Sequence, residues 1–329
     1  MHSAGSDKMN ILKRLEKFWF IHLSPDRLSI FRIIVGIFAF HLLSGRYFAA
    51  LSNNISSSQK PAYLFEQVGV INLLENPLDP GVYKLVLLAA FVFNILFILG
   101  LLYRISGPVF SLLFLFILSY TQSWSMVYHS KNIAVLHCLV LGFTLSADSI
   151  SVDSIIKSRL SGKKSIQFLF GKNNSNNPGW QYGWPVMLIN SMTVICYFLA
   201  GIAKVMGPVG VYWVLGESVR SQVAVDAIRK EFLADGGEVL SYLLYSKIYI
   251  FTAIGISSLV LELGAPLAVI NRRIGYLWSI LTLGMHWGIY FIMGITFRYQ
   301  MAGIIFLPFF PIEKITEYIR SHFTKSDNS

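Results

Sequence analysis

The segment Tyr-Phe-Leu-Ala-Gly-Ile-Ala-Lys-Val-Met, residues 197–206, carries one lysine inside a long apolar run. On a helix, Lys204 shares one face with Tyr197 and Gly201, because neighbours recur at three, four and seven positions. Small residues on that face let a second helix approach, so the amine faces a neighbouring helix or a cavity. A desolvated lysine can take a proton from a substrate. The alternative is that Lys204, near the helix end, reaches the headgroups.

Two histidines extend this chemistry. His286 lies about halfway along a later apolar segment, with Thr282 and Tyr290 one helical turn away on either side. That polar face favours a lined cavity, because polar groups at membrane depth usually face the protein interior. His129 lies at the mouth between two earlier segments. With the topology given below, both histidines fall with Lys204 in the outer half of the bundle, as a candidate proton-handling site.

Other charged groups at membrane depth have simpler explanations. Each costs about 2.5–3.5 kcal/mol to insert, so each is examined as a functional candidate. Glu262 has no oppositely charged residue one turn away; a structural ion pair and a functional role both remain open. Arg32 lies one turn inside the first span, where we expect it to reach the inner headgroups. His41 and His137 are isolated and suit helix-packing hydrogen bonds.

Several kinds of chemistry find no support in the sequence. It has no His-Glu-x-x-His, no phosphate-binding loop and no Gly-x-Ser-x-Gly. Cys138 and Cys196 lie in apolar segments and form no Cys-x-x-Cys, so we expect neither a redox pair nor a metal site. The net charge of +10 does not predict nucleic-acid binding, since Lys and Arg accumulate in the cytoplasmic loops of membrane proteins.

Composition and apolar runs predict the elements that position these residues. The chain is 54% hydrophobic and 13% charged, about half the charged fraction of soluble domains. It is predicted to be an all-α polytopic membrane protein of about eight transmembrane helices, with amphipathic interfacial helices over 208–247, in one domain spanning 1–329. The polar loop from Asp148 to Gly179 is the clearest internal boundary. The spans are predicted at about Ser29–Ala50, Gly81–Leu102, Val109–Ser125, Asn132–Ala147, Trp184–Met206, Tyr249–Ile270 with a late break at Pro266, Ile274–Thr296 and from Met301 onward.

The basic residues predict the topology. With the N-terminus inside, 16 of the 27 lysines and arginines fall in inner segments. This excess predicts that both termini are cytoplasmic and that the number of spans is even. The candidate site then faces the outer side of the membrane, which we expect to be a bacterial inner membrane.

Four stretches carry a resemblance to a known family. They are SPDRLSIFRIIVGIFAF, WSMVYHSKNIAVLHCLVLGFTLSADSISVDS, YFLAGIAKVMGPVGVYWVLGESV, and the segment from LELGAP through GMHWGIYF to LPF. In this order they resemble the membrane part of the vitamin K-dependent gamma-carboxylases, the horizontally transferred transmembrane (HTTM) domain. The resemblance covers nearly the whole chain.

The resemblance implies roles for particular residues. Lys204 matches the lysine that deprotonates vitamin K hydroquinone, His129 a histidine of the later carboxylation chemistry, and His286 a histidine near the naphthoquinone. Vitamin K hydroquinone or menaquinol would then be oxidised to its epoxide, with O₂ and CO₂ as co-substrates. The residues expected to bind the substrate are Tyr197, Gly201, Trp213, Glu262 and Tyr290.

The sequence also departs from the carboxylases. It holds no counterpart of their large lumenal domain, which engages protein substrates, so peptide carboxylation is in doubt. Quinol oxidation is the first expectation. The alternative is a non-carboxylating HTTM protein that helps a secreted peptide to mature or to be exported. The lipid bilayer is the expected partner in either case.

Overall fold

The computed structural model describes residues 13–51, 62–124, 129–159, 177–233 and 239–326. Within these ranges the chain is helical, apart from turns and one isolated bridge between Leu23 and Gly179. The prediction of an all-α membrane helix bundle is confirmed. The chain divides into two compact units, one of Met1–Ile189 with Pro311–Ser329 and one of Asn190–Phe310. Their boundary falls inside a helix and not in the polar loop, and the single domain over 1–329 stays a prediction.

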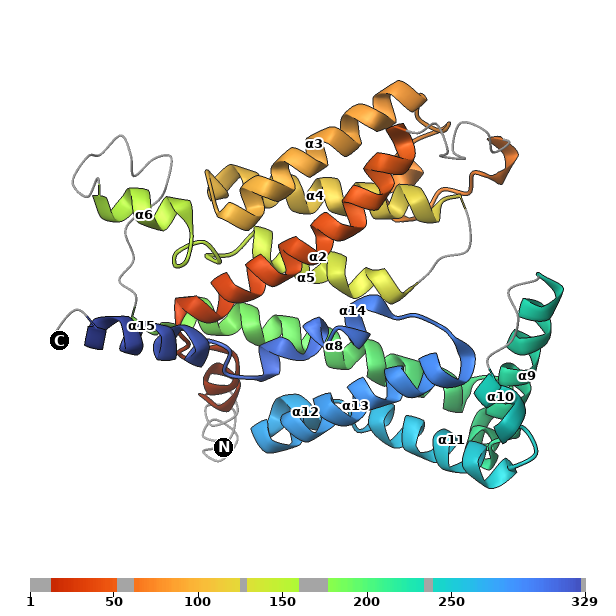
Figure 1. Cartoon of the computed structure of the whole chain (residues 1–329). Coiled ribbons are helices and arrows are strands. Elements are labelled where there is room, and N and C mark those ends of the chain that lie inside the picture. The colour runs from red at the N-terminus through yellow and green to blue at the C-terminus, as the bar shows by residue number, and fades with distance from the viewer. Residues whose placement is uncertain (1–12, 52–61, 125–128, 160–176, 234–238, 327–329) are drawn as a thin grey trace, which may run out of the picture. The chain divides into compact units, whose positions relative to one another are not determined.

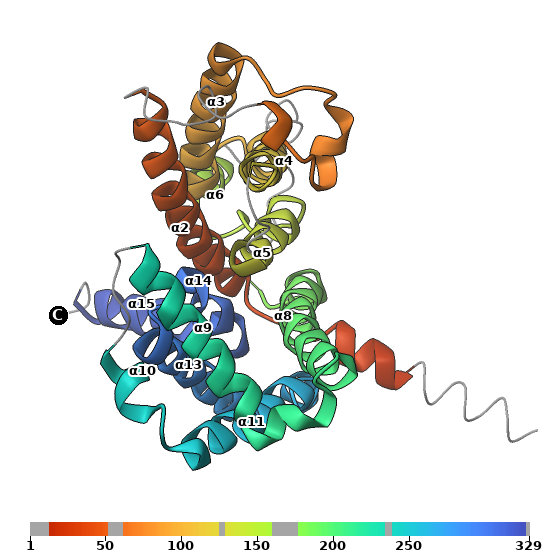
Figure 2. The same cartoon turned by 90° about the vertical axis from the view of Figure 1, so that its right-hand side faces the viewer.

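The first unit is a bundle whose successive helices pack side by side. Helix α2 contacts α3, α3 contacts α4, and α4 contacts α5 (Figures 1 and 2). Its centre holds fully buried aromatic rings, among them Phe97, Phe110 and Phe114. The elements of this unit are α2 (Pro25–Leu51), η1 (Ala62–Leu64), η2 (Gly69–Leu73), α3 (Pro80–Leu99), α4 (Tyr103–Gln122), η3 (His129–Lys131), α5 (Asn132–Gly142), α6 (Val152–Arg159) and α15 (Lys314–Ser326).

The second unit is built around α11 and α13. Helix α11 packs on η4, α9 and α13, and the short α12 packs on α13. Helix α8 (Trp180–Met206) crosses the unit boundary and brings its second half into this unit. The remaining elements are η4 (Gly210–Leu215), α9 (Glu217–Phe232), α10 (Val239–Leu244), α11 (Ile248–Leu263), α12 (Leu267–Ile270), α13 (Arg272–Met293), α14 (Arg298–Met301) and η5 (Ile304–Phe309).

Local signals set the ends of the long helices. Asp79 caps α3 by accepting a hydrogen bond from the amide of Gly81 at 2.7 Å, and Pro80 opens the first turn, where its missing N–H costs nothing. Asn271 caps α13 in the same way, accepting from the amide of Arg273 at 2.9 Å. Gly100 ends α3 at φ 62°, a conformation that glycine adopts without strain. These polar caps satisfy amides that have no partner within the first turn of the helix.

In the described part of the chain, five helices are long and apolar enough to cross a membrane, which makes this chain an integral membrane protein. They comprise residues Pro25–Arg46, Pro80–Leu99, Tyr103–Gln122, Trp180–Met206 and Arg272–Met293; two shorter apolar helices are Asn132–Gly142 and Ile248–Leu263.

The predicted span from Met301 onward is wrong. The segment instead ends α14, turns at Gly303 with φ 72° and continues as the 3₁₀ turn η5, which contains Pro308. A left-handed glycine and a proline without an amide hydrogen prevent a continuous helix there. The predicted late break of the sixth span at Pro266 is confirmed, since α11 ends at Leu263 and Pro266 precedes α12.

Candidate functional site

An ion pair joins Lys204 to Glu262 in the second unit. Lys204 comes from the last turn of α8 and Glu262 from the last turn of α11. The Lys204 ammonium donates a hydrogen bond to Glu262 Oε1; the side chains are 24% and 7% exposed, respectively. The structure therefore gives Glu262 a basic partner and gives Lys204 a partner within the protein. Charges this poorly hydrated require such a partner. A functional role for the pair stays a prediction.

Gly201 explains how the two helices come so close. A β-carbon at Gly201 would lie 3.0 Å from Glu262 Cβ and 2.9 Å from a methyl group of Leu263. Only a residue without a side chain allows this approach, as small residues do between membrane helices. Lys204 follows Gly201 by about one turn on α8. Gly201 thus sets the distance across which Lys204 reaches Glu262 on α11.

The Trp213 ring also contacts the Lys204 ammonium. Lys204 Nζ lies 5.2 Å from the centroid of the Trp213 ring, within the range of a cation–π interaction. Trp213 Nε1 donates to Ser258 Oγ at 3.2 Å, and Ser258 stands one turn before Glu262 on α11. Three contacts link four side chains from α8, η4 and α11, which we call the lysine cluster: Glu262, Lys204, Trp213 and Ser258.

A second polar contact joins α8 to α13. The hydroxyl of Tyr197 and Nε2 of His286 are 2.7 Å apart, and both residues are buried. The Tyr197 ring also packs edge-on against Trp278, with centroids 5.2 Å apart. Trp278 Nε1 in turn donates to the carbonyl of Leu261, next to Glu262, at 2.9 Å. Six of the predicted site residues therefore lie on adjoining elements of one unit: Tyr197, Gly201, Lys204, Trp213, Glu262 and His286.

We expect Tyr197→Phe to reduce the free energy of unfolding by about 1 kcal/mol, because the variant loses a buried hydrogen bond and leaves a histidine nitrogen without it. Denaturant unfolding in detergent measures the loss. Tyr290→Phe is the matched control: Tyr290 is 37% exposed, so we expect a change within about 0.5 kcal/mol. Equal losses in the two variants would show that the Tyr197–His286 contact contributes nothing.

The other two predicted site residues are Tyr290 and His129. Tyr290 stands one turn beyond His286, but its ring contacts Trp287 and Phe291 of its own helix. His129 begins η3 in the first unit, and its side chain lies outside the described part of the structure. That His129 shares a site with Lys204 and His286 stays a prediction.

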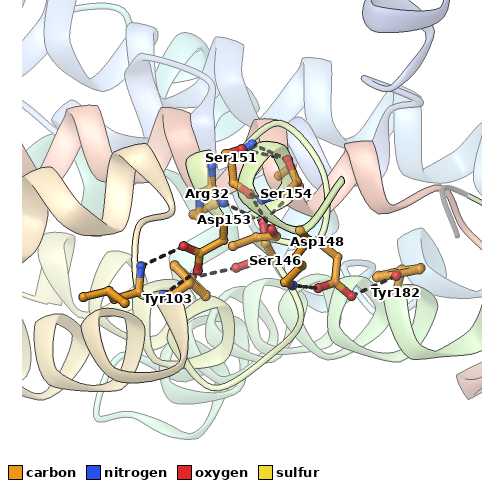
Figure 3. A network of polar contacts seen from close by, with 12 residues as sticks. Arg32, Tyr103, Ser146, Asp148, Ser151, Asp153, Ser154 and Tyr182 are labelled. Atoms are coloured by element: carbon orange, nitrogen blue, oxygen red, sulfur yellow. Dashed lines mark hydrogen bonds and ion pairs between the residues drawn. The ribbon is translucent and has the colours of Figure 1, made fainter. Parts of the chain in front are cut away.

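Arg32 anchors a polar network in the first unit, and the prediction that it reaches the headgroups is wrong. It is fully buried and donates to the carbonyls of Ser146 at 3.0 Å, Ile150 at 2.8 Å and Ile98 at 3.3 Å. A β-carbon at Gly100 would lie 2.6 Å from Arg32 Nη1, so the glycine that ends α3 also makes room for the guanidinium. The segment after α5 folds around Arg32 (Figure 3).

Two aspartates of the same segment complete this network. Asp153 accepts hydrogen bonds from the amides of Leu102 at 2.9 Å and Tyr103 at 2.8 Å, at the start of α4. Burial raises the pKa of the Asp153 carboxyl, against the opposing effect of these amides. Asp148 accepts from Lys157 Nζ at 3.2 Å and from the Tyr182 hydroxyl at 3.0 Å (Figure 3). The network ties α2, α4, α6 and the start of α8 together.

Sequence reasoning missed this network, although the signal was present. The stretch LSADSISVDS holds four serines and two aspartates directly after an apolar helix, and such residues hydrogen-bond to nearby backbone groups. Arg32 was misjudged because its acceptors lie 66 to 118 positions away in the chain. A side chain's distance from a helix end does not reveal contacts of that range.

A shallow pocket of about 380 Å³ lies between α9 and α10, lined by Ile228, Glu231, Phe232 and Tyr242. None of the predicted site residues lines it. Among the described residues, no group of three or more histidine, cysteine, aspartate or glutamate side chains is placed to hold a metal ion.

The chain was compared with known proteins. No family model matches it, no curated protein matches it, and no solved structure matches it.

Proposed function

We propose that this protein is a membrane enzyme that deprotonates a hydroquinone of the vitamin K or menaquinol type at Lys204. The observation that carries the proposal is the lysine cluster, in which a charged amine is held at the end of an apolar helix between a carboxylate and an indole ring. Burying a charge is costly. Apolar side chains would pack equally well between these helices. An ion pair at this position therefore favours a functional role for its two residues.

The surroundings of Lys204 suit an aromatic alcohol. The Lys204 side chain is 24% exposed, and we propose that a ligand oxygen reaches its ammonium from that exposed part. A developing phenolate is stabilised by a cation in a poorly hydrated site, and the Trp213 face offers a flat apolar surface for an aromatic ring. A lipid-soluble hydroquinone would enter from the bilayer.

The full reaction proposed is oxidation of the deprotonated hydroquinone by O₂ to the quinone epoxide and water. Carboxylation with CO₂, as the HTTM resemblance implies, is a further step of the proposal. So are the roles of His129 and His286 in positioning groups or passing protons. We also propose a bacterial inner membrane location, with cytoplasmic termini and the lysine cluster toward the outer side.

Quinone epoxide formation by the purified protein tests this function. The protein in lipid nanodiscs is given menaquinol and O₂, and the epoxide is measured by chromatography. We expect Lys204→Ala to lower the rate by about 100-fold or more, the usual contribution of a positioned base.

Lys230→Ala is the matched control for this assay. Lys230 is also an ion-paired lysine of the second unit, 3.0 Å from Asp226, but it lies outside the lysine cluster. We expect its rate to stay within about twofold of the unchanged protein, since it contacts no proposed substrate. Absence of epoxide with the unchanged protein, or equal rates for Lys204→Ala and the unchanged protein, would refute the proposal.

A further inference from the structure

The proposed function leaves open where the hydroxyl proton goes, because Lys204 is already paired with a carboxylate. An amine that donates to a carboxylate is held in its charged form, and a charged amine has no lone pair to accept a proton. For Lys204 to take a proton from a ligand, it must pass one on. Glu262 is the group to which it donates.

Glu262 has the capacity to receive that proton. Among the described residues, Oε2 of its carboxylate is buried and accepts no hydrogen bond, so Oε1 carries the one contact, with Lys204. Carboxylates that are held strongly in the ionised form accept two or three hydrogen bonds. Glu262 accepts one hydrogen bond in the described structure and is 7% exposed. It therefore lacks most of the hydrogen bonds and the hydration that stabilise a charged carboxylate.

Charge conservation favours the same route. Transfer from a neutral hydroxyl to a neutral amine creates two charges in a poorly hydrated site, which is expensive. Transfer through the ion pair creates none: the ligand oxygen becomes the anion and the carboxylate becomes neutral, while the ammonium stays between them. The Lys204 ammonium is paired with the Glu262 carboxylate before the transfer and with the ligand oxygen anion after it. An ion pair therefore offsets the desolvation of the ammonium throughout.

We propose that Glu262 is the proton store of the site and that Lys204 relays the proton of an aromatic hydroxyl to it. The ligand O–H bond breaks as a new N–H bond forms on Lys204, and a different N–H bond of Lys204 breaks as an O–H bond forms at Glu262 Oε1. No oxidant takes part in this step. This inference rests on the proposed function and adds to it the acceptor of the proton.

The remaining members of the cluster position Lys204. A β-carbon at Gly255 of α11 would lie 2.6 Å from the Trp213 carbonyl, and Thr252 Oγ1 donates to the Leu215 carbonyl at 2.9 Å. These contacts hold η4 close against α11, and Ser258 fixes the indole nitrogen. These contacts therefore hold the Trp213 ring against the Lys204 ammonium.

Proton counting with 1-naphthol tests the relay without turnover. Its hydroxyl resembles that of the hydroquinone, and its ionised form has a distinct absorption spectrum. Ionisation of the bound ligand is read from that spectrum, and protons released to solvent are read by titration calorimetry in buffers of different ionisation enthalpy. In the unchanged protein at pH 7 we expect bound naphtholate, almost no proton release and an affinity independent of pH, because the proton stays on Glu262.

Glu262→Gln removes the store. The ligand can then bind the ammonium as naphtholate only after naphthol has lost its proton to water. We therefore expect about one proton released per bound ligand and an affinity that rises about tenfold per pH unit. Asp226→Asn is the matched control, because it removes a carboxylate from another lysine of the same unit; its proton count should equal that of the unchanged protein.

The possible outcomes distinguish the relay through Glu262 from the proposed function, deprotonation of a hydroquinone at Lys204. No bound naphtholate in the unchanged protein would refute both. Bound naphtholate with no proton release in Glu262→Gln would keep the function and overturn the relay, because Lys204 alone would then hold the proton. A second readout does not require the variant to fold: in the unchanged protein, naphthol binding should produce the infrared carbonyl band of a protonated carboxyl group, and its absence would also overturn the relay.

Discussion

Lys204→Met is expected to lower the free energy of unfolding by about 3 kcal/mol, because removing one partner of a buried pair leaves the other charge uncompensated. The remaining Glu262 side chain is 7% exposed and would have no cation beside it. The double variant Lys204→Met/Glu262→Leu should recover most of the loss, since two apolar side chains replace a buried pair at little cost. Unfolding by denaturing detergent, followed by tryptophan fluorescence, measures all three proteins.

Lys230→Met is the control for the Lys204→Met variant. Asp226, the partner of Lys230, also accepts from Arg229 at 2.7 Å. Removal of Lys230 therefore leaves the carboxylate paired, and we expect a loss of no more than about 1 kcal/mol. If the double variant is no more stable than Lys204→Met, the lysine and glutamate are not coupled in the folded protein.

Arg32→Met is expected to lower the free energy of unfolding by about 4 kcal/mol. The guanidinium supplies hydrogen bonds to three carbonyls, two of them on the segment after α5. Hydrogen bonds from a charged donor contribute about 1.5–3 kcal/mol each, and the carbonyls would stay in surroundings that water does not reach. Thermal unfolding of the protein in detergent measures this loss.

Arg32→Lys separates charge from geometry. It keeps the charge, but the compact ammonium lacks the planar fork that reaches several acceptors, so we expect about half of the loss. Arg104→Met is the control: Arg104 is exposed in the same unit, and the change should stay within about 0.5 kcal/mol. Equal stability of Arg32→Met and Arg104→Met would contradict the role assigned to the Arg32 network.

Several features of this protein follow from local sequence alone. Apolar runs near 20 residues predict helices that can cross a membrane, and the helices α3, α8 and α13 lie close to their predicted positions. Their ends are set by residues next to them, such as Asp79, Gly100 and Asn271. The small-residue face of Lys204 likewise predicted a close helix neighbour, which is α11. These properties depend on neighbours in the chain, so the sequence displays them directly.

Other features depend on contacts between distant parts of the chain. Lys204 and Glu262 are 58 positions apart, and Arg32 and Ser146 are 114 apart. Hydropathy reports how each segment interacts with lipid or water, but it carries no information on which face of one helix meets which face of another. The sequence by itself determined that this is an all-α membrane protein with charged residues inside its apolar segments. The tertiary structure decided that Lys204 is paired with Glu262 and that Arg32 is an internal anchor, because a buried charge is stabilised by whichever partner the packing brings within hydrogen-bonding distance.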